Sequence, residues 1–504
     1  MYLPKPLVGQ TPGHVQMCHH VGDVQPSFRV LAYEFHRCHR DMHCWREKGT
    51  RFPLNDRHTA IRLEDPTRPV VSGMTPNKTA WHEPFNVQDQ GELLDVLATH
   101  PYPLFTADCN HEPFNSMRNG CHPSVQSLMY AALSGRPCFV EEAGGLGPNV
   151  ASDARTAETL RTGLFTAWAH GIAGYLWWCA FDQSHLDFKP YADCPVEQEL
   201  GLLLADRTPK PQALAMREFR RFVDALPFTN LPPRRIDAVC LLTEQEPNAW
   251  RQALGSFLLA RQAGFDVAFS GADHAFPKAD FYILPDVKAL RSYPARTWKS
   301  LRHAAENGAT LLITKEQGLL THFLETTGNE IEYTCDGEWH ADVAIPGATD
   351  NIRVSGSKRH VVTSRRSTVI ARDSAGNPFM TEASLGKGKV IFINAGIENM
   401  AVSRDDCFGW KDPNPVYRLY AEAARRAGVV RRATKGLPCV GMTEHPLPGG
   451  KAWCVAVNYA PEAVSCPLST QGRVGRVFGG TFDGTRLSIG AGGAAVFEIG
   501  EEVR

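Results

Sequence analysis

The stretch "RPCFVEEAG" (136–144) decides how the N-terminal part of the chain folds. Its apolar run predicts a buried strand, and two carboxylates, Glu141 and Glu142, follow directly. Because neighbouring residues of a strand face opposite ways, one carboxylate should point into the mouth of the sheet and the other should pack outward. The small residues after them leave room above the carboxylate. This pattern favours a functional site at the carboxyl end of a parallel strand.

Further strands and helices extend on both sides of this stretch. Apolar runs predict strands at 68–74, 93–103 and 173–181, with an earlier one in "RVLAYEF" (29–35). Helical spacing predicts helices at 124–135 and 154–171, and "TPKPQALAMREFRRFVDALPF" closes the region as an amphipathic helix. Alternation of short strands and helices is typical of α/β units with parallel strands.

Two further regions follow the segment "TNLPPRR", which reads as a linker. Residues 236–432 alternate strands with helices, the pattern of a doubly wound sheet, and contain no G-x-G-x-x-G or Walker loop. Residues 436–504 alternate with period two between glycines and predict a small β-sandwich. The predicted fold class is therefore α/β: a partial (β/α)8 TIM barrel over 59–228, a flavodoxin-like doubly wound domain and a C-terminal β-sandwich.

Composition narrows the class of function. The 504 residues are 43% hydrophobic and 21% charged, with a formal net charge of -1. Such a balance gives no reason to expect a nucleic acid or membrane partner, and no apolar run reaches the ~20 residues of a membrane span. The start lacks the layout of a signal peptide, and the 14 cysteines have no regular spacing, so we expect reduced thiols and a cytoplasmic location.

Residues 1–58 form an atypical N-terminal segment. They hold Cys18, Cys38, Cys44 and a high density of histidines, which raises the alternative of a zinc site. The spacings do not form the paired pattern of a zinc motif, so we expect no metal. A degraded, truncated or wrongly started N-terminus accounts for the composition more simply.

Two short motifs add to the chemistry of the carboxylates Glu141 and Glu142. His100 and Tyr102, in "THPYP", share one facing at a strand end and could hydrogen-bond a carboxylate or a sugar hydroxyl. Trp177 and Trp178, in "GYLWW", end another strand, where one indole could stack on a sugar ring and the other would belong to the core.

Together these motifs resemble clan-A glycoside hydrolases, most closely family 5, the cellulase and β-mannanase group. The resemblance covers about residues 29–228 and rests on four motifs in the family's order: "DPTRPVVSGM", "HPYP", "VEEAG" and "YLWW". It implies that Glu142 is the nucleophile, that His100 and Tyr102 assist it, and that Trp177 or Trp178 is the sugar platform. Residues 236–432 resemble the glutamine-amidotransferase-like domain that follows the barrel in family 42 β-galactosidases and helps to form trimers. Homo-oligomerisation is therefore expected, but no amidotransferase activity, because no nucleophile elbow is present.

The chain departs from the family at the acid/base. The family's Asn-Glu pair would fall near Arg37 and Cys38, which cannot replace a tuned glutamate. Glu34 has the right separation from the nucleophile and is our first candidate acid/base, with Glu83 second. Glu83 and Glu112 stand in two copies of "HEPFN" that resemble the family's motif at the wrong positions. Too few residues precede "VLAYEF" for three more barrel units of ~30 residues each.

The leading expectation is a retaining β-glycosidase that cleaves a β-linked mannoside, glucoside or galactoside without metal or organic cofactor. The alternative is a catalytically impaired fragment that binds carbohydrate or oligomerises. A zinc protein built on the N-terminal cysteines and histidines is a third, weaker hypothesis.

Overall fold

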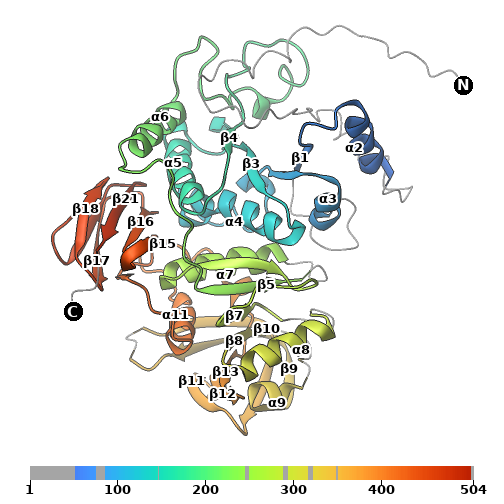
Figure 1. Ribbon diagram of the computed structural model, residues 1–504, viewed down its shortest axis with the longest axis vertical. Helices are drawn as coiled ribbons and strands as arrows, with labels where there is room; N and C mark the ends of the chain where they lie inside the picture. Colours follow the sequence, from blue (N-terminus) through green and yellow to red (C-terminus); the bar gives the residue numbers. More distant parts are fainter. Residues whose placement is uncertain are drawn as a thin grey trace, which may run out of the picture.

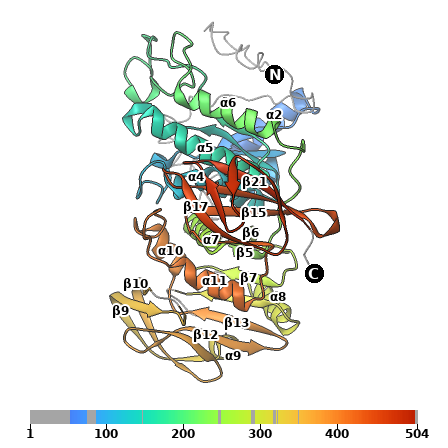
Figure 2. The ribbon, with the colours of Figure 1, turned by 90° about the vertical axis from the view of Figure 1, so that its left-hand side faces the viewer.

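The computed structural model describes residues 52–74, 86–145, 147–243, 249–287, 293–315, 320, 322–347 and 350–500. Figure 1 shows a parallel sheet with its helices at the top, a second α/β region below it and a red β-sandwich at the left. Figure 2, turned by 90°, shows the sandwich lying across the junction between the other two. One hydrophobic core is continuous from Leu97 and Val125 through Phe257 to Val455 and Val496, so it joins all three regions.

The first region contains four strands that pair in chain order, all parallel. They are β1 (Val71–Met74), β2 (Val96–Thr99), β3 (Cys138–Ala143) and β4 (Tyr175–Trp177). The helices are α2 (Phe52–Glu64), α3 (Val87–Leu93), α4 (Met117–Ser134), α5 (Asp153–Ala169) and α6 (Pro211–Asp224), with 3-10 turns η2 (Pro103–Phe105), η3 (Gly147–Asn149) and η4 (Pro195–Glu197). The predicted α/β pattern is confirmed here, whereas the strand expected at 29–35 lies outside the described residues.

Helix α4 begins earlier than the apolar spacing predicted. The Ser116 side chain caps it by accepting from the Asn119 backbone N–H, and Gly135 ends it with φ of 67°. The first turns carry buried polar residues, including Arg118 at 0% exposure, so periodicity alone missed them. They are buried because α4 packs against β2 and β3 and also against α7 (Ala249–Ala263) and β6 (Val267–Gly271) of the second region.

The second region is a nine-stranded sheet with a doubly wound parallel part. Its parallel strands follow the spatial order β6, β5 (Ala238–Leu242), β7 (Phe281–Leu284), β8 (Thr310–Thr314), β13 (Gly388–Ile393). In chain order this is 2-1-3-4-5, the flavodoxin-like arrangement, which confirms the predicted class. Helices α7 and α8 (Ala295–Glu306) contribute to separate hydrophobic clusters, and α9 (Phe323–Thr327), α10 (Ile397–Val402) and α11 (Tyr417–Arg426) complete the helices of this region.

Four antiparallel strands extend this sheet beyond β13, and none of them was predicted from the sequence. They are β9 (Asn329–Ala344), β10 (Ile352–Ser364), β11 (Thr368–Asp373) and β12 (Pro378–Leu385). The β9–β10 hairpin is largely exposed along β9, where Tyr333 is 58% exposed. Because a solvent-facing strand needs no regular apolar alternation, the hydrophobic pattern gave no signal for β9.

The C-terminal region is a sandwich of two four-stranded antiparallel sheets, as predicted. One contains β15 (Val440–Pro446), β16 (Ala452–Asn458), β21 (Ala494–Ile499) and β18 (Val474–Phe478). The other contains β14 (Ala433–Lys435), β17 (Val464–Thr470), β20 (Arg486–Ile489) and β19 (Gly480–Phe482).

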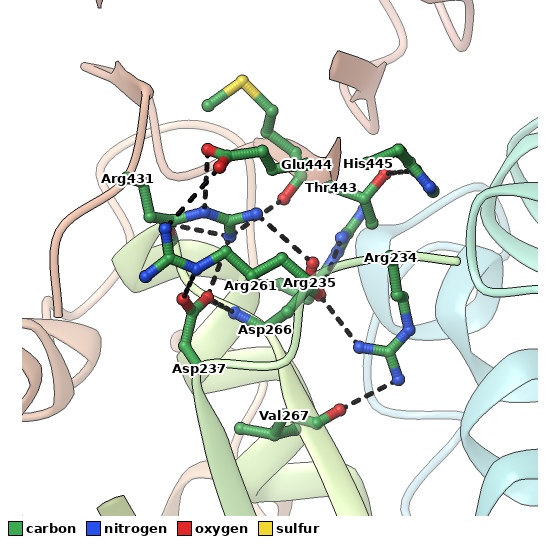
Figure 3. Close-up of polar contacts among 12 residues, drawn as sticks. Arg234, Arg235, Asp237, Arg261, Asp266, Val267, Arg431, Thr443, Glu444 and His445 are labelled. Atoms are coloured by element: carbon green, nitrogen blue, oxygen red, sulfur yellow. Dashed lines mark hydrogen bonds and ion pairs between the residues drawn. The ribbon is translucent and has the colours of Figure 1, made fainter. Parts of the chain in front are cut away.

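A buried ionic network holds the second and third regions together (Figure 3). Asp266, 1% exposed at its side chain, lies 3.5 Å from Arg261 and 3.5 Å from Arg431. Arg431 also lies 3.4 Å from Asp237 and 3.9 Å from Glu444 of β15. Burial opposes ionisation of Asp266, but the His170 hydrogen bond and the surrounding arginines outweigh it and hold the pKa of Asp266 well below its usual range.

Candidate active site

The carboxyl ends of the four parallel strands bring the predicted site residues to one edge of the sheet. His100 directly follows β2, Glu142 lies in the last residues of β3, and Trp177 ends β4. Strands β2 and β3 pair with Thr99 opposite Val140, so the residues that follow lie side by side. This is the edge at which barrel enzymes assemble their active sites.

Strand β3 does not alternate as the sequence predicted. Val140 is opposite Tyr175 and Ala143 is opposite Trp177, so three steps along β3 match two along β4. The extra residue is a bulge, which breaks the alternation over Glu141 and Glu142. The expectation that one carboxylate would pack outward is therefore wrong: both contact the same imidazole.

That imidazole belongs to His100. Its Nε2 lies 3.0 Å from Glu141 Oε2, and its Nδ1 lies 3.4 Å from Glu142 Oε2. Tyr102 donates its hydroxyl hydrogen to the same Glu142 oxygen at 3.1 Å. The side chains of His100, Glu141 and Glu142 are 15%, 21% and 25% exposed, so all three are sheltered yet reachable from solvent.

Tyr102 is held as a hydrogen-bond donor. Burial, the charge of Glu142 and the hydrogen bond to Glu142 raise the pKa of Tyr102 well above its usual value. The phenol therefore keeps its hydrogen at any ordinary pH. A carboxylate that accepts from such a donor is fixed in orientation.

Two glycines allow this close packing. A Cβ at Gly73 of β1 would collide with both His100 Nε2 and Glu141 Oε2, so the pair lies directly against the β1 backbone. At Gly144 a Cβ would lie 2.9 Å from the Tyr102 ring. Side chains are thus excluded at both points where the polar groups meet the sheet.

The two indoles sit beside this cluster. Trp177 donates its Nε1–H to the Leu200 carbonyl at 3.0 Å, which fixes its ring. Trp178 packs against the small apolar group of Tyr102 and Leu200, and its backbone N–H donates to Ala143 O at 2.9 Å. Both are half-buried, and the sugar-platform role of either one stays a prediction.

The acid/base predictions have a different outcome. Glu34 and Glu83 lie outside the described residues. Glu112, from the second "HEPFN" copy, is 2% exposed at its side chain and pairs with buried Arg118 at 3.1 Å, so it is committed to structure. Glu141 and Glu142 meet opposite nitrogens of His100, so the imidazole lies between the two carboxylates and Glu141 is not placed as the acid/base partner of Glu142.

Sequence reasoning noticed Glu141 but gave it no role, and it missed Gly73. The signal for Glu141 was its position beside the predicted nucleophile. No sequence signal could reveal the bulge that turns it toward His100.

The described residues contain neither a cluster of metal ligands nor a membrane-spanning helix. In this part of the chain no three or more His, Cys, Asp or Glu side chains are grouped so that they could hold a metal ion. None of its helices combines the length and the apolar character of a membrane span.

Comparison with solved structures establishes the class of fold. The chain shares its fold with several solved glycosidase structures: among the described residues, a sheet of four parallel strands with its helices is followed by a second α/β region and a β-rich C-terminal region. No family model and no curated protein sequence matches the chain.

Three solved structures illustrate the likeness. The exo-β-1,4-mannosidase from Opitutaceae bacterium strain TAV5 is 19% identical with a TM-score of 0.55, over 74% of this chain and 68% of that one. A GH42 β-galactosidase from G. stearothermophilus is 14% identical with a TM-score of 0.58, over 87% and 65%. The cold-adapted β-galactosidase from Rahnella sp. R3 is 13% identical with a TM-score of 0.63, over 89% and 66%. The chain thus spans about two thirds of the length of these proteins.

Proposed function

We propose that this chain carries the nucleophile of a retaining β-glycosidase and that Glu142 is that nucleophile. The supporting observation is the Glu142 carboxylate at the carboxyl end of β3, which accepts from Tyr102 and faces His100. In the first step a Glu142 oxygen bonds to the anomeric carbon while the glycosidic C–O bond breaks and its electron pair leaves with the aglycone. Water then hydrolyses the glycosyl ester and regenerates the carboxylate.

The comparisons support the proposed substrate class. The similar structures include a β-mannosidase and β-galactosidases by name. We therefore propose a β-linked mannoside, glucoside or galactoside, with Trp177 or Trp178 as the apolar platform for the sugar ring. The acid/base is unassigned, and Glu34 and Glu83 remain its candidates.

Covalent labelling tests the nucleophile. A 2-deoxy-2-fluoro β-glycoside with an activated leaving group should accumulate as an ester on one carboxylate, which peptide mass spectrometry identifies. We expect the label on Glu142 and none in Glu142→Gln. The matched control is Glu218→Gln, on the exposed face of α6, which should label like the parent chain. A label on another residue, or undiminished turnover in Glu142→Gln, would refute the assignment.

Activated aryl glycosides test turnover separately from acid catalysis. A good leaving group needs little protonation, so hydrolysis of 2,4-dinitrophenyl glycosides requires the nucleophile alone. Tyr102→Phe should lower kcat/KM on these substrates about 10- to 150-fold, because a hydrogen bond to a charged group is worth about 1.5–3 kcal/mol. An unchanged kcat/KM would show that the Tyr102 contact plays no part.

A second candidate is a carbohydrate-binding protein without hydrolysis. The observation that favours it is that neither Glu112 nor Glu141 is placed to act as the acid/base. Glu112 is paired with Arg118, and His100 lies between Glu141 and Glu142. Calorimetric binding of oligosaccharides, with no release of dinitrophenol and no fluoro-glycoside ester, would support this alternative over the glycosidase.

A further inference from the structure

We propose that Glu141 is a positioning residue that holds His100 beside Glu142. This role rests on the proposed function of Glu142. Glu141 Oε2 lies 3.0 Å from His100 Nε2, a hydrogen-bond distance, whereas Glu142 meets the other ring nitrogen at 3.4 Å. The imidazole is therefore bound at both nitrogens by carboxylates from one strand.

The Glu141 contact orients the ring. A carboxylate at hydrogen-bond distance accepts the N–H of Nε2, which fixes both the hydrogen position and the tilt of the imidazole. The other nitrogen, Nδ1, then faces Glu142 at 3.4 Å. Glu141 thus determines which side of the ring Glu142 meets.

The contact with Glu141 persists while Glu142 reacts. When Glu142 becomes a glycosyl ester, its own contact with the ring changes, whereas Glu141 stays at Nε2 and keeps the imidazole in place. Glu141 acts through His100 and does not touch the sugar.

The backbone is shaped around this pair. The bulge in β3 turns Glu141 toward the ring, although regular alternation would turn it to the opposite face of the sheet from Glu142. The absence of a side chain at Gly73 provides the space in which the Glu141 and His100 side chains meet. Two separate features of the backbone thus serve one contact.

Ring nitrogen resonances test the proposal without requiring turnover. The full chain is labelled with 15N-histidine, and His100→Asn assigns the His100 signals by difference. In the parent chain we expect the hydrogen on His100 Nε2, where Glu141 accepts it, and in Glu141→Gln we expect this preference for Nε2 to be lost. Glu141→Asp, which keeps the carboxylate, should restore part of the Nε2–H signal. Glu218→Gln removes a surface carboxylate and should leave the signal unchanged.

Kinetics with the aryl glycosides provide the second readout. Glu141→Gln should lower kcat about 10- to 100-fold with little change in KM, because a charged hydrogen bond to the ring is lost while sugar contacts remain. If Glu141→Gln fails to fold, judged by thermal unfolding, Gly73→Ala separates the same pair while retaining both side chains. An unchanged ring signal or an unchanged kcat in these variants would overturn the role of Glu141. Absence of a fluoro-glycoside ester on Glu142 would instead overturn the proposed function, and the ring signal would still decide whether Glu141 holds His100.

Discussion

Asp266 offers the sharpest test of how the regions are joined. Its carboxylate lies 3.5 Å from Arg261, 3.5 Å from Arg431 and 3.7 Å from Arg234, and its side chain is 1% exposed. It also lies 3.5 Å from His170 at the end of α5, so it reaches a residue of the first region. Asp266→Asn keeps the size of the side chain and removes the anion from beneath three buried cations.

The expected cost follows from burial. Removing one partner of a buried ion pair destabilises a protein by about 3–5 kcal/mol, because the remaining charge is left uncompensated. One kcal/mol shifts the unfolding midpoint by about 2–4 °C for units of 150–250 residues, so Asp266→Asn should lower it by roughly 6–20 °C. The affected transition is the one that separates the β-sandwich from the α/β sheet.

Differential scanning calorimetry measures this change, with the first transition compared between variants because a chain of several regions need not unfold in one step. Asp224→Asn is the matched control: Asp224 is 53% exposed and pairs with Arg220 on the surface of α6. Exposed pairs contribute about 0–1 kcal/mol, so this control should shift the midpoint by only a few degrees at most. Equal shifts for Asp266→Asn and Asp224→Asn would refute the idea that the buried network holds the regions together.

Two further predictions concern the site and acid sensitivity. Gly73→Ala should push His100 and Glu141 apart and lower turnover of aryl glycosides by about tenfold or more, with little added loss when combined with Glu141→Gln, because both changes remove the same contact. Burial lowers the pKa of His170 to about 3 and that of His445 to about 4, so below pH ~6.5 the unfolded chain takes up protons that the folded chain does not. Stability should fall by about 2 kcal/mol per histidine between pH 7 and pH 5, and urea unfolding midpoints that stay constant over this range would contradict these buried neutral rings.

Much of the architecture was predictable from local pattern. Short apolar runs bounded by glycine and proline placed the parallel strands, and helical spacing placed α5 within a few residues. The apolar alternation of the tail placed the sandwich. Strand β9 was missed because it faces solvent over most of its length, so no apolar periodicity marks it.

The sequence by itself determined which residues stand at strand ends: His100, Tyr102, Glu142 and Trp177 follow from the position of each apolar run. Only the tertiary structure decided that Glu141 turns toward His100. That contact depends on how β3 pairs with β4, and an extra residue in one strand is visible only when its partner is known. The sequence shows how many aspartates and arginines the chain contains, but not that three arginines enclose Asp266. Burial of these charges depends on regions far apart in the chain meeting at one place.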